Sequence, residues 1–204
     1  RLDPDTARSE RLQRHLARFP ERYQRLIRAQ VDPTGRRYEL LHDAAAHAPN
    51  FAFASFVEAS ELFHRGPLAG HSRRESIEPF QHAATLWPAF APVWEYLAWE
   101  RTADGDSADA KDALDRYGRH AASTDVESQV ILALITGGFH WRFSPPELAA
   151  QVTAQILAQP GISAYRDLAA GASYMISFDA PAGAVAVGER FALWRERPEL
   201  RVPG

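Results

Sequence analysis

The sequence predicts an all-α protein, an α-solenoid of about five stacked antiparallel helix pairs. Three observations indicate this class. Apolar residues recur at spacings of three, four and seven, which is the period of an amphipathic helix. No stretch alternates polar and apolar residues for long, and no hairpin turn separates two β-rich runs. One pattern of small and large residues also returns after 34 residues, which is typical of a helix-pair repeat.

The repeated pattern is clearest in residues 76–122. Its members fall on one helix face, and each has a counterpart 34 residues later: Ser76, Phe80, Ala83 and Pro88, then Ala110, Leu114, Tyr117 and Ala122. A fixed step of this length indicates that one structural unit is used again along the chain.

A tryptophan, a leucine, a small residue and a glycine turn lie between the two sets: Trp94, Leu97, Ala98 and Gly105-Asp106. This combination resembles the tetratricopeptide repeat, although Tyr117 and Ala122 stand where that family usually has alanine and proline. The resemblance implies a protein–protein interaction or scaffold module that binds a peptide, or another domain, through its concave face and loops. Similar repeats occur beside bacterial kinase and transcription-regulator domains. We therefore expect the repeat region of a larger bacterial regulatory protein.

The same frame extends along the chain with longer steps. We expect a single domain over residues 1–204, with approximate units 10–49, 50–88, 89–123, 124–160 and 161–199. Two enlarged loops, 64–71 and 137–144, account for the longer steps, and each contains two glycines. In the first unit, Pro20 should separate two helices and residues 32–35 should form a turn. In the second, either Ala59 or Ser60 could fill the small-residue position.

Composition limits the classes of function. The chain has 204 residues with a formal net charge of -3, which gives no reason to expect nucleic acid as a partner. It has no cysteine, so disulfides, thiolate metal sites and cysteine nucleophiles are excluded. The sequence contains no run of about 18 apolar residues, so we expect no membrane span. No signal-peptide pattern follows Arg1, so we expect a cytoplasmic protein, either an excised domain or a processed product.

No motif for a phosphate, a dinucleotide or a serine nucleophile is present, so we expect neither an enzyme nor a cofactor. One alternative is a small metal-dependent hydrolase-like site that uses His64, His71 and His140. Two neutral imidazoles around one loop would be an incomplete metal site. Glu95 and Glu100 are expected to be solvated ions. A third possibility is a structural spacer or a homo-oligomer interface.

We expect the binding residues in the two enlarged loops, because insertions in repeat proteins often map to a binding face. Trp99 lies about 140° around its helix from Trp94, so it either packs against a neighbouring unit or is exposed on the concave surface. The alternative for the loop aromatics is that they cover an irregular helix junction. The candidate partner-binding residues are Trp99, His64, Arg65, Leu68, His71, Phe139, His140, Trp141, Arg142 and Phe143.

Overall fold

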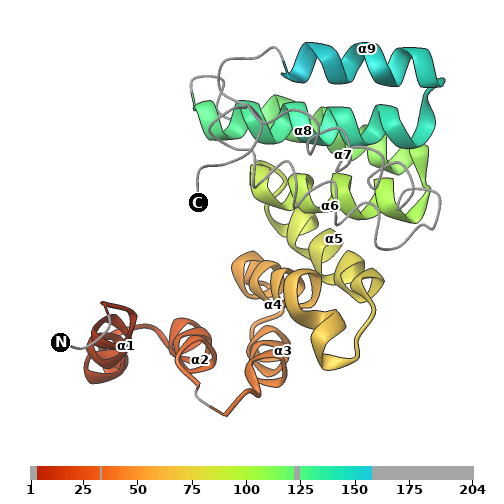
Figure 1. Ribbon diagram of the computed structural model, residues 1–204. Coiled ribbons are helices and arrows are strands. Elements are labelled where there is room, and N and C mark those ends of the chain that lie inside the picture. The colour runs from red at the N-terminus through yellow and green to blue at the C-terminus, as the bar shows by residue number, and fades with distance from the viewer. Residues whose placement is uncertain (1–3, 33, 122–124, 158–204) are drawn as a thin grey trace. The chain divides into compact units, whose positions relative to one another are not determined.

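A computed structural model describes residues 4–32, 34–121 and 125–157. All regular structure in these ranges is helical, which confirms the predicted all-helical class (Figure 1). The α-helices are α1 (Pro4–Arg14), α2 (Glu21–Gln30), α3 (Arg37–His47), α4 (Ala52–Arg65), α5 (Ile77–Leu86), α6 (Ala91–Asp104), α7 (Ser107–His120), α8 (Val126–Phe143) and α9 (Pro146–Leu157). Short 3-10 helices are η1 (Leu16–Arg18), η2 (Gly66–Ala69) and η3 (Arg73–Ser76).

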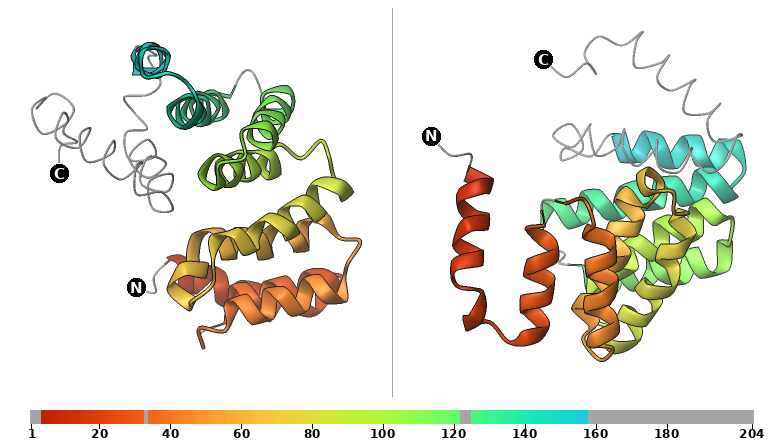
Figure 2. Two further views of the ribbon diagram at one scale, coloured as in Figure 1. Left: turned by 90° about the vertical axis from the view of Figure 1, so that its right-hand side faces the viewer. Right: turned by 90° about the horizontal axis from the view of Figure 1, so that it is seen from below.

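The chain divides into two compact units, Arg1–Ala89 and Phe90–Gly204. The division falls beside the predicted boundary between the second and third repeat units. Within the first unit α2 contacts α3, α3 contacts α4 and α4 contacts α5. Within the second unit α6, α7 and α8 contact one another, and α8 contacts α9. The right-hand view of Figure 2 shows α1, α2 and α3 running up and down in alternation. The predicted fifth pair, 161–199, lies outside the described residues.

Two predicted turns separate the first helices. Pro20 precedes α2, where its φ of -54° and missing N–H suit a helix start. After α2, the Asp32 carboxylate accepts hydrogen bonds from Thr34 Oγ1 at 2.6 Å and from the backbone N of Thr34 at 3.1 Å. The Thr34 hydroxyl is the main cause of the lowered pKa of Asp32. Gly35 has a φ of +80°, a conformation that favours glycine, and it directs the chain into α3.

One core cluster of the first unit consists of leucines and alanines on α2, α3 and α4. The cluster contains Leu26, Ala29, Leu41, Ala44, Ala45 and Ala54. The distance between packed helices depends on the side chains at the contact, so these alanines let the helices lie close together. On the same unit Ala59 is fully buried whereas Ser60 is partly exposed, so Ala59 fills the small-residue position that the sequence left open.

The repeat frame correctly predicts six buried residues, each at most 7% exposed: Phe80, Ala83, Leu97, Ala98, Ala110 and Leu114. A step of 38 residues from Ala110 carries the frame to Leu148 of α9, and the burial that it predicts there is wrong. Leu148 is 41% exposed, whereas its neighbour Ala149 is buried. The physical reason is the face that α9 presents to α8, where Val152 and Ile156 pack against Val130 and Ala133.

The predicted loop at 137–144 is also wrong, because α8 continues through it to Phe143. The two adjacent glycines suggested a helix stop, but a Cβ at Gly137 would lie 2.8 Å from Ile156 Cδ1 of α9. The glycine therefore makes room for a neighbouring helix. The helix ends instead at Ser144, whose ψ of 157° is extended, since a residue that precedes proline avoids the helical conformation.

The tight turn predicted at residues 104–106 is confirmed. Gly105 ends α6 with a φ of +89°, the left-handed conformation typical of a helix C-terminus. The Asp106 carboxylate then accepts a hydrogen bond from the backbone N of Asp109 at 3.1 Å and so caps α7.

Candidate functional site

The first predicted binding loop is largely helical. The helix α4 continues through His64 and Arg65, η2 follows, and Gly70 turns the chain with a φ of +85°. Leu68 is 88% exposed, and the Arg65 side chain is 60% exposed. Both side chains therefore have the exposure that a contact surface requires.

The two histidines of this loop have separate surroundings. The His64 ring lies edge-on at 5.1 Å from the ring of Phe63, and burial is the main cause of its lowered pKa. His71 Nδ1 lies 2.9 Å from Glu75 Oε2, and the His71 ring lies 4.5 Å from the ring of Tyr38 on α3. This His71 hydrogen bond is the main cause of the lowered pKa of Glu75. His71 is thus held against α3.

The residues predicted for the second loop occupy the last turns of α8. The ring of Phe139 lies 5.0 Å from that of Phe143 and 5.7 Å from that of His140, and His140 Nδ1 lies 2.8 Å from Ser144 Oγ. Arg142 is exposed, whereas the side chains around it are partly buried: Phe139, His140, Trp141 and Phe143. The second enlarged loop predicted from the sequence is therefore absent, because these residues are helical.

Of the two alternatives for Trp99, exposure on a concave surface is wrong, because the side chain is buried at 6% exposure. Trp94 is also buried, although it points elsewhere around α6, because α6 contacts both α7 and α8. The two carboxylates expected to be solvated are enclosed as well. Glu100 is 2% exposed, and burial, reinforced by the charge of Glu127, raises the pKa of Glu95 to about 7.

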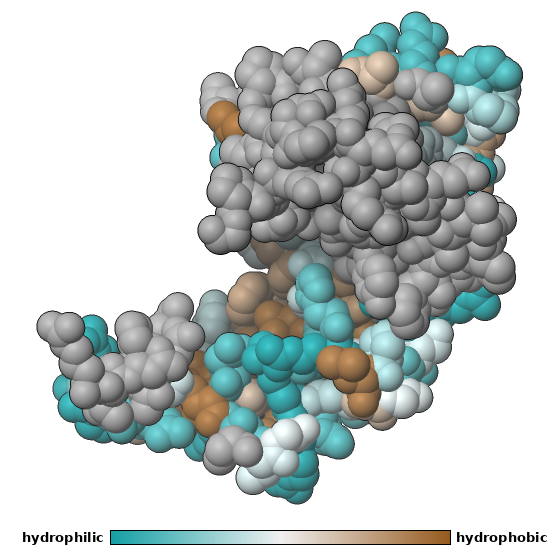
Figure 3. All heavy atoms as spheres, in the orientation of Figure 1, coloured by the Kyte–Doolittle hydropathy of each residue, from teal (hydrophilic) through white to brown (hydrophobic). Residues whose placement is uncertain are grey.

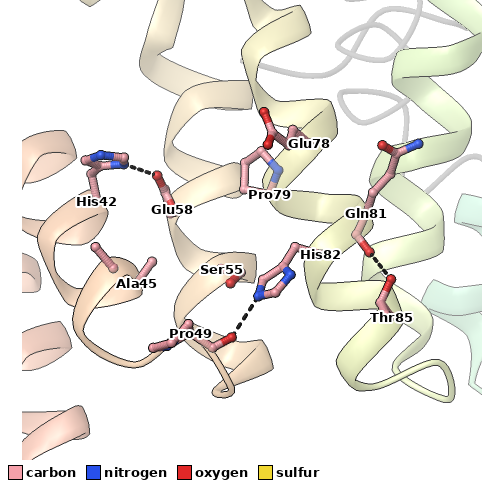
Figure 4. Close-up of a pocket in the computed structure, with 11 residues that line it drawn as sticks. His42, Ala45, Pro49, Ser55, Glu58, Glu78, Pro79, Gln81, His82 and Thr85 are labelled. Carbon is pink, nitrogen blue, oxygen red and sulfur yellow. Dashed lines mark hydrogen bonds and ion pairs between the residues drawn. The ribbon is translucent and has the colours of Figure 1, made fainter.

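An open groove of about 520 Å³ lies within the first unit, between α3 and α5 and above α4 (Figure 4). Both α3 and α5 contact α4, so side chains of three helices converge there. The lining residues are His42, Ala45, Ala46, Pro49, Ser55, Glu58, Glu78, Pro79, Gln81, His82 and Thr85.

Glu58 is the most enclosed charged residue of the groove, at 8% exposure. Its Oε1 lies 2.6 Å from Nδ1 of His42, whose side chain is 64% exposed, and Figure 4 shows the two side chains pointing toward each other from facing helices. Among the described residues, the second carboxylate oxygen has no hydrogen-bond partner. An ionised carboxylate has about four acceptor sites, so most of this capacity is open to the groove.

A second histidine, His82 of α5, lines the opposite side of the groove. His82 Nε2 donates a hydrogen bond to the backbone O of Pro49 at 2.7 Å, which joins α5 to the turn after α3 (Figure 4). A carbonyl oxygen only accepts, so the proton of the His82 ring lies on Nε2 in this contact. The hydrogen bond fixes the separation of α3 and α5 at this end.

A row of ring contacts connects the groove to the predicted loop. The Tyr38 ring lies 6.0 Å from the ring of His42 and 4.5 Å from that of His71. The pKa of Tyr38 is raised, chiefly by burial and then by the charges of Glu58 and Glu75. Of the residues predicted for binding, His71 is therefore the one that these contacts connect to the groove.

Sequence reasoning missed the floor of the groove, although a signal was present. Ala59 of α4 and Ala98 of α6 are both fully buried, and aligning them (98 - 59 = 39) gives a step of 39 residues. With that step, Ser55 aligns with Trp94 and Glu58 with Leu97. Two polar residues thus occupy positions that hold large apolar side chains in the second unit.

The neighbouring side chains of His42 and Asp43 have separate partners. Asp43 Oδ2 accepts a hydrogen bond from Arg25 Nη1 at 3.0 Å, whereas His42 turns to Glu58. Within the ranges that the structure describes, no three His, Asp or Glu side chains gather where a metal ion could bind. His140 belongs to a different unit from His64 and His71.

None of the described helices has both the length and the apolar character that a membrane span requires.

Comparisons with known proteins add no relative. No protein-family model matches the chain, no curated protein is significantly similar to it, and no solved structure matches it.

Proposed function

We propose that this chain is a protein-binding module, a degenerate tetratricopeptide-like solenoid that holds a segment of a partner protein in the groove between α3 and α5. The observation that carries the proposal is the floor of the groove, where Ser55 and Glu58 are 3% and 8% exposed. Polar residues at core positions oppose stable packing, and such conflicts are expected at functional sites.

The shape and lining of the groove suit a peptide side chain. Its volume lies in the range of ligand sites, and it combines apolar walls with a few polar groups. Ala45, Ala46 and Pro79 supply apolar surface, while Glu58 and His42 supply the polar contacts. The groove is open to the surface, which lets an extended segment place one side chain in it while its neighbours lie outside.

The loop after α4 extends the proposed surface. Leu68 and Arg65 project from it, and His71 connects it to the groove through Tyr38. The resemblance to repeats that occur beside bacterial regulatory domains supports a non-enzymatic role in the cytoplasm, with a partner on another chain or a neighbouring domain of the same polypeptide.

Filling the groove tests the proposal. Peptides are selected on the full chain from a displayed random library. Their affinities are then measured for the unaltered chain and for Ala46→Trp, which places a large side chain on an exposed lining residue. The control is Ala108→Trp, at an exposed alanine of α7 in the other unit. We expect the selected peptides to lose about tenfold or more in affinity for Ala46→Trp, equivalent to about 1.4 kcal/mol, and nothing for Ala108→Trp. Unchanged affinity for Ala46→Trp would refute the groove as the binding site.

A further inference from the structure

We propose that the groove receives an arginine side chain of the partner peptide, with Glu58 as the carboxylate that pairs with the guanidinium. This inference rests on the proposed function and names the chemistry of the partner. Four observations carry it: the charges that line the groove, the partners of nearby arginines, the open oxygen of Glu58 and the apolar walls.

The lining is acidic. Glu58 of α4 and Glu78 of α5 are its carboxylates, and among the described residues that line it there is no lysine or arginine. The other titratable groups are His42 on α3 and His82 on α5. With neutral histidines, the groove carries two negative charges and favours a cation.

Two basic side chains of α2 and α3 are engaged with acidic residues outside the groove lining. Arg25 pairs with Asp43 at 3.0 Å, and Arg37 pairs with Glu61 at 2.9 Å. Because no lysine or arginine lines the groove, a partner peptide can supply the cation that complements Glu58.

Glu58 can accept further hydrogen bonds from a charged donor. Its side chain is 10% exposed, and His42 occupies only one of its oxygens. A buried carboxylate with few hydrogen bonds is unfavourable, and a guanidinium supplies several donors in a planar fork that matches a carboxylate. A lysine ammonium would offer a point charge without that fork.

The walls fit the rest of an arginine. Its methylene stem can lie along Ala45, Ala46 and Pro79 while the charged end reaches Glu58, since long basic side chains bury their stems on apolar surface. Glu78 is exposed on α5 and supplies a second carboxylate at the groove. On the face of the first unit that Figure 3 shows, brown hydrophobic patches lie among teal polar residues.

The test uses the full chain and three short peptide mixtures that are random except at the centre. The central residue is arginine, its uncharged analogue citrulline, or glutamate. Binding is followed by the backbone amide NMR signals of Ala45, Ala46 and Thr85, which line the groove. We expect the arginine mixture to shift these signals and to bind about tenfold or more tightly than the citrulline mixture.

Three variants complete the experiment. Glu58→Gln and Glu78→Gln each remove one charge from the lining, and Glu39→Gln removes one from an exposed residue of α3 that does not line the groove. We expect Glu58→Gln to weaken the arginine mixture about tenfold, Glu78→Gln to weaken it less, and Glu39→Gln to have no effect. Melting temperatures show whether each variant is folded. If Glu58→Gln does not fold, Glu78→Gln still tests whether the negative charge of the lining matters.

Two results would overturn the inference. If arginine and citrulline mixtures shift the groove signals equally, the assigned chemistry is wrong, while the groove remains a binding site. If both lining variants bind the arginine mixture as the unaltered chain does, Glu58 is not the receiving group. Failure of the proposed function itself looks different, because peptides selected from the displayed library would then leave the groove signals unchanged.

Discussion

Gly137 of α8 lies so close to Ile156 of α9 that a Cβ at position 137 would come within 2.8 Å of Ile156 Cδ1. Alanine is the better helix former by about 1 kcal/mol, so a substitution free of contacts would stabilise the helix. We predict that Gly137→Ala gives little or none of this gain in the free energy of unfolding, because the end of the Ile156 side chain must shift to admit the added methyl. Urea denaturation measures the change.

The chain offers a matched control for that variant. At Gly118 of α7, a Cβ would lie 3.6 Å from Leu132 Cδ1, an ordinary van der Waals distance. Gly118→Ala should therefore raise the free energy of unfolding by about 0.5–1 kcal/mol. In an Ile156→Val background, which removes Cδ1, Gly137→Ala should become favourable. An equal effect of Gly137→Ala in both backgrounds would show that this contact is not the cause.

The buried Glu95 predicts a loss of stability as the pH rises. Burial and the charge of Glu127 raise its pKa in the folded protein to about 7, from an ordinary value of 4.5. The folded state then holds a proton that the unfolded state has released. The protonated Glu95 carboxyl contributes on the order of 3 kcal/mol to the free energy of unfolding. This contribution is fully present below pH 4.5 and is lost as the pH rises through about 7.

Glu95→Gln should abolish this decline and be the more stable protein at about pH 8, as followed by denaturant unfolding at several pH values. Glu39→Gln, at an exposed position, should keep the decline in stability with rising pH. The comparison with Glu95→Gln isolates Glu95 from His64, whose lowered pKa changes stability in the opposite direction. If the unaltered chain and Glu95→Gln lose the same stability on raising the pH, Glu95 is not the titrating group.

Two fully enclosed alanines test the repeat frame. Ala83 and Ala98 are 1% and 0% exposed, so there is no space for a larger side chain. We predict that Ala83→Leu and Ala98→Leu each cost about 1–3 kcal/mol in the free energy of unfolding. Ala108→Leu, at an exposed site, should change it by less than about 0.5 kcal/mol. Denaturation midpoints that stay constant in both core variants would argue against the frame.

The sequence was sufficient where structure depends on neighbouring residues in the chain. Helix starts and turns at Pro20, Gly35 and Gly105 follow from backbone preferences of single residues. The burial of Phe80 and Leu114 follows from helical period and residue size. These features need no knowledge of which helix packs where.

The sequence was insufficient where a distant helix decides the outcome. Gly137 suggests a helix stop until Ile156, on the next helix, is seen beside it. The sequence leaves Trp99 either packed or exposed until α6 is found in contact with both α7 and α8. The groove was missed because α4 could be aligned on Ala59 or on Ser60, and only the first alignment places Glu58 at a core position.

Binding of the partner peptide in the groove between α3 and α5 is tested most directly by protection of a single thiol placed there. The chain contains no cysteine, so Ala46→Cys puts one reactive group at the groove and Ala108→Cys puts one on α7 as a control. The rate of maleimide labelling is measured with and without a saturating peptide selected on the unaltered chain. We predict that the peptide slows labelling of Ala46→Cys by about tenfold or more and leaves Ala108→Cys unchanged. Labelling of Ala46→Cys at the same rate with and without bound peptide would contradict binding in the groove.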